Sequence, residues 1–174
     1  MNNMKKTLFA PALTLLLALT AFCSCTKEGT EIFEGYYSYK LSGEITLTQI
    51  VDETDTVTVP EVLTLSLTPE SGQMNILTRD KDGGKMVITL NAMGGDATTL
   101  EASVEDGKLV IPASDKYFSS ELLKFKLSIS GEGSKLSDMV LMDLTAAETE
   151  ISYLGKNYTL TDSKITCVAT SNER

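Results

Sequence analysis

Histidine and tryptophan are both absent from this sequence of 174 residues. Without histidine, the chain cannot form a Ser-His-Asp or Cys-His catalytic arrangement, and it lacks a ligand found in most zinc and copper sites. Without tryptophan, it lacks the aromatic platform that carbohydrate-binding sites use most. We therefore expect a protein that is not an enzyme, with no catalytic residues, no metal ion and no cofactor.

Basic side chains are outnumbered, since 15 Lys and Arg stand against 24 Asp and Glu, a net charge of −9. No stretch concentrates positive charge, and phosphate backbones need such a patch, so we expect no nucleic-acid partner. Asp80 and Asp82 lie in DKDGG, which we read as a turn because position 12 of a calcium loop would be Asn91, not Glu. The acidic segment 52–55 is read as a solvated loop. Because so many acids always include pairs, a carboxylate-based glycoside hydrolase stays as a remote alternative.

A long apolar run occurs once, at residues 8–22, directly after Lys5 and Lys6. Its 15 residues fall short of the roughly 18 to 20 that cross a bilayer as a helix. A basic start, a short apolar core and small residues at the end are typical of an export signal. We therefore predict that residues 1–24 are a signal peptide and that nothing in the mature chain spans a bilayer. Signal removal leaves 13 basic and 24 acidic side chains, a net charge of −11.

Cysteine is scarce, with Cys23 and Cys25 at the end of this run and Cys167 far from both. The segment FCSC, residues 22–25, resembles the lipobox of bacterial lipoproteins, in which a cysteine after a small residue is acylated and becomes the first residue. Cys25 follows Ser24 and fits, whereas Cys23 follows Phe22 and does not. The resemblance implies lipidation at Cys25, a lipidated N-terminus and short tether over residues 25–34, and attachment to the outer membrane. Whether the protein faces the periplasm or the cell surface stays open, and soluble secretion is the alternative to lipidation.

From residue 35 onward, apolar and polar residues alternate with a period of two, which predicts half-buried antiparallel strands. The expected inward-facing sets are Tyr37, Tyr39 and Leu41; Leu63, Leu65 and Leu67; Met86, Ile88 and Leu90; Leu100, Ala102 and Val104; Leu109 and Ile111; Leu123, Phe125, Leu127 and Ile129; and Ile165, Cys167 and Ala169. Cys167 is therefore expected in the core, and no disulfide is expected within the domain. The segment 136–144 is apolar on both faces, so we expect burial on both sides.

Turn-forming segments separate these runs: RDKDGGK, MGGD, EDGK, SGEGSK and LGKNY. A long first strand is expected to bend at Gly43, and residues 115–123 hold the one segment suited to a helical turn. The fold class predicted for residues 35–174 is a single all-β domain, an antiparallel up-and-down β-barrel of about 8–10 strands, with a β-sandwich as the alternative.

The triplet Gly35-Tyr36-Tyr37 resembles the Gly-x-Trp that opens the first strand of lipocalins and related calycins. With the segments GYYSYKLSG and NAMGGD, the chain is similar to small calycin-like lipoproteins of Bacteroides-type bacteria. The resemblance implies a barrel in which an aromatic ring plugs the base and a late basic residue stacks on it. Tyr37 stands at the position of that ring, and Lys164 is the nearest basic candidate in the final strand. The family has no assigned reaction, so the resemblance implies no activity.

These patterns favour a cell-envelope lipoprotein that binds a small ligand, for instance an apolar one, or a protein partner. Met74, Met86 and Met142 suit a ligand cavity but fill an ordinary core equally well. The alternative is a structural or adhesive surface component built as a sandwich, which predicts an exposed strand edge. Finally, Asp55-Thr56-Val57 resembles the Asp-Thr/Ser-aliphatic site of bacterial O-glycosylation, which makes Thr56 a candidate acceptor.

Overall fold

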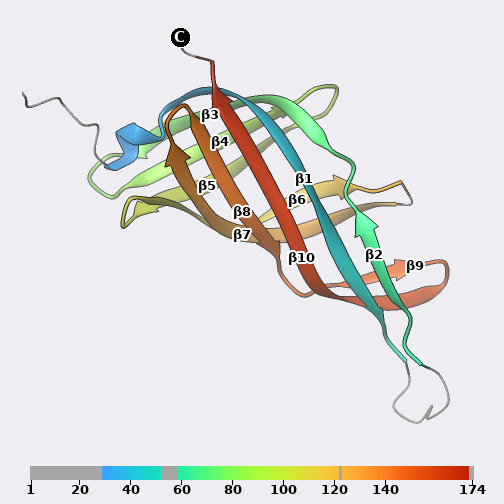
Figure 1. Cartoon of the computed structure of the whole chain (residues 1–174). Coiled ribbons are helices and arrows are strands. Elements are labelled where there is room, and N and C mark those ends of the chain that lie inside the picture. Colours follow the sequence, from blue (N-terminus) through green and yellow to red (C-terminus); the bar gives the residue numbers. More distant parts are fainter. Residues whose placement is uncertain (1–28, 52–58, 122, 173–174) are drawn as a thin grey trace, which may run out of the picture.

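The computed structural model describes residues 29–51, 59–121 and 123–172 (Figure 1). The predicted signal peptide, the lipidation site Cys25, the acidic segment 52–55 and Thr56 lie outside the described residues. In chain order the elements are a 3-10 helix η1 (Gly29–Ile32) and the strands β1 (Gly35–Gln49), β2 (Val62–Ser66), β3 (Glu70–Asp80), β4 (Lys85–Ala92), β5 (Ala97–Glu105), β6 (Lys108–Ser119), β7 (Lys124–Leu136), β8 (Met139–Ala146), β9 (Glu150–Tyr153) and β10 (Lys156–Ser171).

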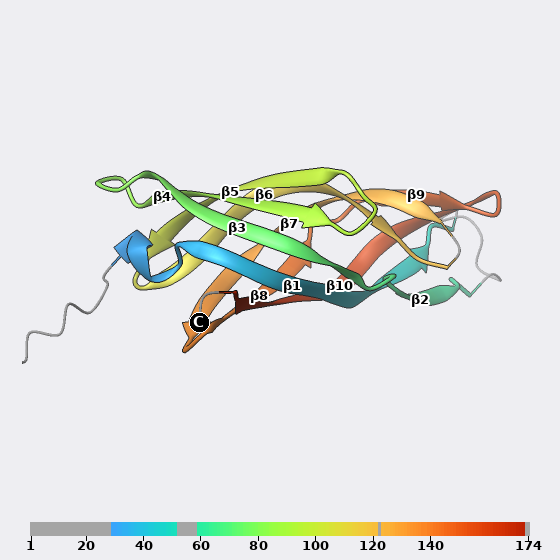
Figure 2. The same cartoon turned by 90° about the horizontal axis from the view of Figure 1, so that it is seen from above.

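Eight of the strands close into an antiparallel barrel. The hydrogen-bonded order runs β1-β3-β4-β5-β6-β7-β8-β10, and β10 pairs back with β1 (Figures 1 and 2). β2 pairs only with the second half of β1, and β9 pairs with the first half of β10, so these two strands extend the wall at one end. The predicted barrel is therefore confirmed, and the sandwich alternative is wrong.

The inner face of the barrel is filled by side chains. Every set predicted to point inward does so, with Leu63, Val104 and Leu123 half-buried and the other members buried. Met74, Met86 and Met142 are part of this packed interior. η1 covers one end of the barrel, where Phe33 is buried. Residues 29–34, the described part of the segment expected to be a tether, thus pack against the domain.

β1 changes neighbours at Gly43, the residue at which a bend was expected. Its first half pairs with β3 up to Leu41, and its second half pairs with β2 from Glu44. A Cβ at residue 43 would clash with the main-chain carbonyl oxygen of Lys164 in β10. A glycine is needed at this point because only hydrogen fits between the two strands.

Two local predictions are wrong. Residues 115–119 continue β6, and the expected helical turn is a hairpin turn in which Ser120 exchanges main-chain and Oγ hydrogen bonds with Leu123. The segment SGEGSK lies inside β7, because Gly131 lets β7 approach the backbone of β8. The chain turns later, at Ser137 and Asp138, where Ser137 takes a positive φ of 56°.

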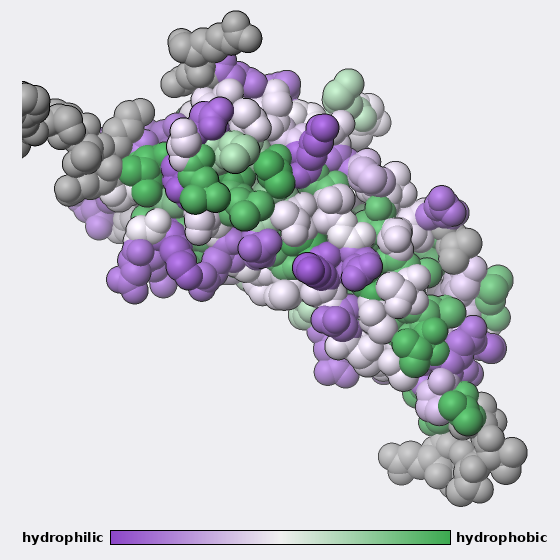
Figure 3. Space-filling view, viewed as in Figure 1, coloured by the Kyte–Doolittle hydropathy of each residue, from purple (hydrophilic) through white to green (hydrophobic). Residues whose placement is uncertain are grey.

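β8 is not buried on both sides, contrary to expectation. Val140, Met142 and Leu144 point inward, whereas Met139 is exposed and Leu141 half-buried on the outer face. Figure 3 shows apolar surface over this part of β8 and β10. No helix within the described residues has both the length and the apolar character needed to cross a bilayer.

Candidate functional site

The alternation of β6 changes phase in mid-strand. Before Pro112, Leu109 and Ile111 point into the barrel; beyond it, the inward residues are Lys116 and Phe118. The register with β7 shifts just after Ile111, and such a bulge turns the following side chains to the opposite face. Pro112 suits the bulge because it has no N–H to donate to a ladder. The local sequence therefore places a lysine inside the barrel.

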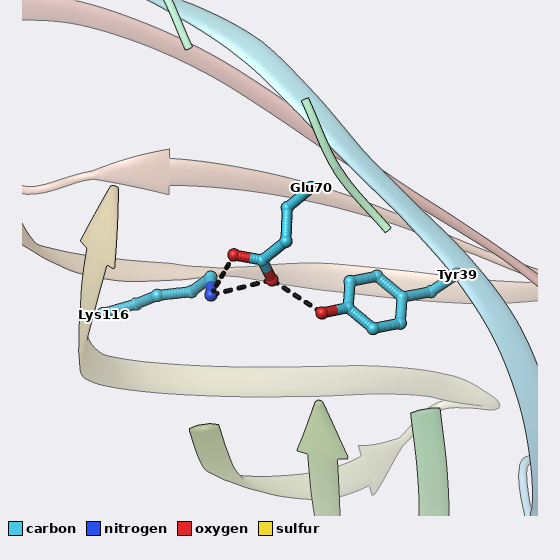
Figure 4. Close-up of polar contacts among 3 residues, drawn as sticks. All are labelled: Tyr39, Glu70 and Lys116. Carbon is cyan, nitrogen blue, oxygen red and sulfur yellow. Dashed lines mark hydrogen bonds and ion pairs between the residues drawn. The ribbon is translucent and has the colours of Figure 1, made fainter. Parts of the chain in front are cut away.

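Lys116 is the one charged side chain that is buried among the described residues, with 4% of its side chain exposed. Its Nζ lies 3.0 Å from both carboxylate oxygens of Glu70, and the Tyr39 hydroxyl donates a 2.7 Å hydrogen bond to Glu70 Oε1 (Figure 4). Nζ also lies 5.5 Å from the centre of the Phe118 ring. Three strands, β1, β3 and β6, thus contribute to one ion-paired cluster, which we call the Glu70 cluster (Tyr39, Glu70 and Lys116).

Besides burial, the negative charge of Glu70 contributes to raised pKa values at Tyr39, within the cluster, and at Cys167, next to it. Burial, the hydrogen bond to Glu70 and the negative charge of that carboxylate all raise the pKa of Tyr39, which stays a neutral donor. Burial raises the pKa of Cys167 to about 12; the Glu70 carboxylate adds to this rise, and Lys116 opposes it. Cys167 is therefore a protonated core thiol, in agreement with its predicted place.

A surface hollow of about 270 Å³ opens beside the cluster. Its lining is mixed, with somewhat more polar than apolar exposed surface, and it includes Glu70 together with the apolar residues Leu41, Pro69, Met93 and Phe118. Among the described residues, β5 pairs with β6 only through residues 103–105. The later part of β6 therefore has no partner in β5, and its residues 117–119 line the hollow. Glu70 keeps 24% of its side chain exposed and lines the hollow, so this residue belongs both to the interior ion pair and to the hollow.

The opposite end of the barrel, beside η1, is closed by an aromatic ring. The buried Tyr37 donates a 2.7 Å hydrogen bond to the carbonyl oxygen of Phe33. Lys135 Nζ lies 4.7 Å from the centre of the Tyr37 ring and 3.1 Å from its hydroxyl. The cation over this ring thus comes from β7, not from the last strand, and the expectation for Lys164 is wrong because Lys164 is exposed.

Asp80 forms the predicted turn, in which its Oδ1 accepts a hydrogen bond from the Gly83 N–H. Tyr36 and Tyr117 are exposed, whereas Tyr158 and Phe118 are buried. In the part of the chain that the structure describes, no three Asp, Glu or Cys side chains gather in a way suited to a metal ion.

Sequence reasoning missed both charged members of the Glu70 cluster. Glu70 occupies an inward position of β3, in phase with Met74 and Ile76, and Lys116 is in phase with Phe118. The available signals were Pro112, which interrupts the alternation, and Phe118, whose position fits the shifted phase. Chemically, the arrangement offers a fixed negative acceptor at a hollow whose lining is part polar and part apolar. Comparison with known proteins adds no identity, since no protein family, no curated protein and no solved structure matches this chain.

Proposed function

We propose that this protein is a lipid-anchored protein of the outer membrane that binds a small, partly apolar ligand at the hollow beside Glu70. The export signal and the lipobox-like segment ending at Cys25 support the location. The binding role is supported by one observation above all, the ion-paired Glu70 at a hollow of mixed polar and apolar lining. No chemical step is assigned to the site.

The buried ion pair argues for a binding role because it does little for stability on its own. Moving Lys116 and Glu70 out of water carries a desolvation cost that their attraction offsets only in part, and apolar replacements of such pairs are often as stable. The pair does, however, fix the Glu70 carboxylate at the wall of the hollow. A group held in place before the ligand arrives loses little freedom on binding.

The dimensions and chemistry of the hollow define the ligand class. A volume of about 270 Å³ lies just below the range of small-molecule sites, roughly 300 to 1,000 Å³, and therefore suits a small ligand. The walls from Leu41, Met93 and Phe118 suit an apolar body. Glu70 accepts bonds from Tyr39 and Lys116 and, as an ionised carboxylate, has capacity for one more donor. The ligand is therefore a small molecule with an apolar part and a hydroxyl or amine.

A fluorescent probe of this class tests the proposal. N-phenyl-1-naphthylamine is apolar and carries one N–H, and a chain without tryptophan gives little background emission. We expect saturable binding that weakens by about fivefold, or ~1 kcal/mol, in Met93→Ser, because Met93 supplies apolar wall. Leu154→Ser is the matched control, since both side chains are 82% exposed in turns and Leu154 lies outside the hollow. Equal binding by both variants would remove the hollow as the site.

The anchor is tested separately by metabolic labelling with a clickable fatty acid. The label is expected on the wild type and on Cys23→Ala, and it is expected to disappear in Cys25→Ala because Cys25 supplies the acylated sulfur. Label that persists in Cys25→Ala, or an unmodified protein recovered from the culture fluid, would contradict the proposed location.

A further inference from the structure

Among the described residues, no strand pairs with one of the two edges of β2. On its inner side, the Gln49 N–H bonds to the carbonyl oxygen of Glu61, and the Leu67 N–H bonds to that of Gly43. Main-chain groups of alternate residues in a strand point to opposite sides. The odd residues of 61–67 thus face β1, and the N–H and C=O groups of Val62, Thr64 and Ser66 point away from it. Within the described residues, β2 pairs with β1 alone.

This free edge lacks the features that usually prevent strand pairing. Natural edge strands are blunted by charges, proline, bulges or very short length. The sequence of β2, VLTLS, contains no charge and no proline, its pairing with β1 has no register shift, and Val62 is 59% exposed. β9, by comparison, has only four residues and carries Glu150. Figure 3 shows apolar side chains at the surface along the part of this face that holds β2.

A second hollow lies along the same edge. Its volume is about 430 Å³, and it is lined by residues 64–69 of β2 and its continuation together with Ser120 and Glu121 of the β6–β7 turn. More of its exposed lining is apolar than polar. A strand added to β2 would turn alternate side chains toward this hollow, which gives a place for an apolar residue. Glu121, the charged residue of this lining, favours a basic residue beside it.

We propose that the free edge of β2 binds an extended segment of a protein partner, with apolar residues at alternate positions and a lysine or arginine at its end. The segment pairs through the main-chain groups of Val62, Thr64 and Ser66 and places one apolar side chain in the hollow beside Glu121. This inference rests on β2 and the β6–β7 turn and is independent of ligand binding beside Glu70.

The test uses the full mature chain and the acetylated, amidated peptide KVTVTVK, labelled with a fluorophore. Binding measured by fluorescence anisotropy is expected for the wild type and should weaken about tenfold or more in Thr64→Pro, which removes one outward N–H. The β1–β2 hydrogen bonds use the odd residues, so Thr64→Pro leaves them in place. Thr64→Val, which keeps the N–H, is the matched control, and circular dichroism on each variant verifies the fold.

Two further readouts separate this proposal from its competitors. Hydrogen exchange is expected to show fast exchange at Val62, Thr64 and Ser66 in the free protein and protection of these amides with the peptide. A peptide N-methylated at every residue, which keeps no N–H on either of its edges, should not bind. Failure of the wild type to bind at millimolar peptide, or equal binding by Thr64→Pro with its fold intact, would overturn the proposal. If the protein instead forms a concentration-dependent dimer that Thr64→Pro abolishes, the partner of the β2 edge is a second copy of this chain, and the proposal is overturned. Met93→Ser should bind the peptide with unchanged affinity, because Met93 belongs to the hollow beside Glu70 and not to the β2 edge.

Discussion

The ion pair inside the barrel makes a quantitative prediction through the variants Glu70→Gln and Lys116→Met. Glu70→Gln removes the negative charge but keeps an oxygen that can accept the hydrogen bond from Tyr39. It leaves the ammonium of Lys116, 4% exposed, without an opposite charge. Lys116→Met fills a similar volume with an apolar chain and leaves a carboxylate that is 24% exposed.

The geometry sets the size of each effect. At 3.0 Å and an effective dielectric constant of ~20, the two charges attract by about 5.5 kcal/mol. Losing the partner of a buried charge typically costs about 3 to 5 kcal/mol, and we expect Glu70→Gln near that range. Lys116→Met should cost less, about 1 to 3 kcal/mol, because Glu70 reaches solvent and keeps Tyr39. The double variant holds no charge, so its stability should return to within about 1 kcal/mol of the wild type.

Urea unfolding followed by circular dichroism measures these free energies. The double-mutant cycle should give a coupling energy of at least about 2 kcal/mol. The exposed pair Lys108–Glu132, with a 2.7 Å separation, is the control and should show no measurable coupling. Additive effects in the Glu70–Lys116 cycle, with the double variant the least stable of the set, would refute the reasoning.

Three other predictions follow from the packing and the pKa values. Gly43→Ala should destabilise the fold by about 2 kcal/mol or more, because the added Cβ would clash with the carbonyl oxygen of Lys164. Urea unfolding measures this loss, with Ser42→Ala as the control variant. Lys135→Met should lower the free energy of unfolding by about 1 kcal/mol, because it removes the cation over the Tyr37 ring. Lys164→Met should leave the urea midpoint unchanged. A larger loss in Lys164→Met than in Lys135→Met would contradict the assignment of Lys135 as the cation over Tyr37. Because the pKa of Cys167 is raised from 9.0 to about 12, the unfolded chain loses this proton first, and stability should fall as the pH rises above about 9. Unfolding measured between about pH 8 and pH 10 should show a smaller fall in Cys167→Ala, and equal slopes would contradict the raised pKa.

Most of the barrel wall was predictable because one physical rule governs it. A strand with one face in a packed interior must alternate, so the inward positions of β4, β7 and β10 follow from their residues alone. Closure into a barrel was also predicted. Strand pairs that no hairpin connects, such as β1 with β10, could not be predicted, because they form only when distant parts of the chain meet. Gly131 illustrates what the sequence does not settle, because a glycine is typical both of a turn and of a close approach between two backbones. In the structure, Gly131 lies inside β7, where the backbone of β8 comes close to it.

The candidate site was not predicted because it depends on a break in that rule. The bulge after Ile111 reverses the phase of β6, and one shifted residue is enough to bring Lys116 inside. Glu70 is acceptable at an inward position only because Lys116 and Tyr39 arrive from other strands. Sequence patterns describe one strand at a time, whereas this cluster exists only after three strands have met. The same limit explains Lys135, which reaches Tyr37 from a strand remote in sequence.

Native mass spectrometry of the protein purified from its own host tests the central claim, ligand binding beside Glu70, most directly. The account predicts a second species, heavier by one small molecule, that is present in Leu154→Ser and depleted in Met93→Ser. A single ligand-free mass in the wild type, or an adduct equally abundant in both variants, would contradict it.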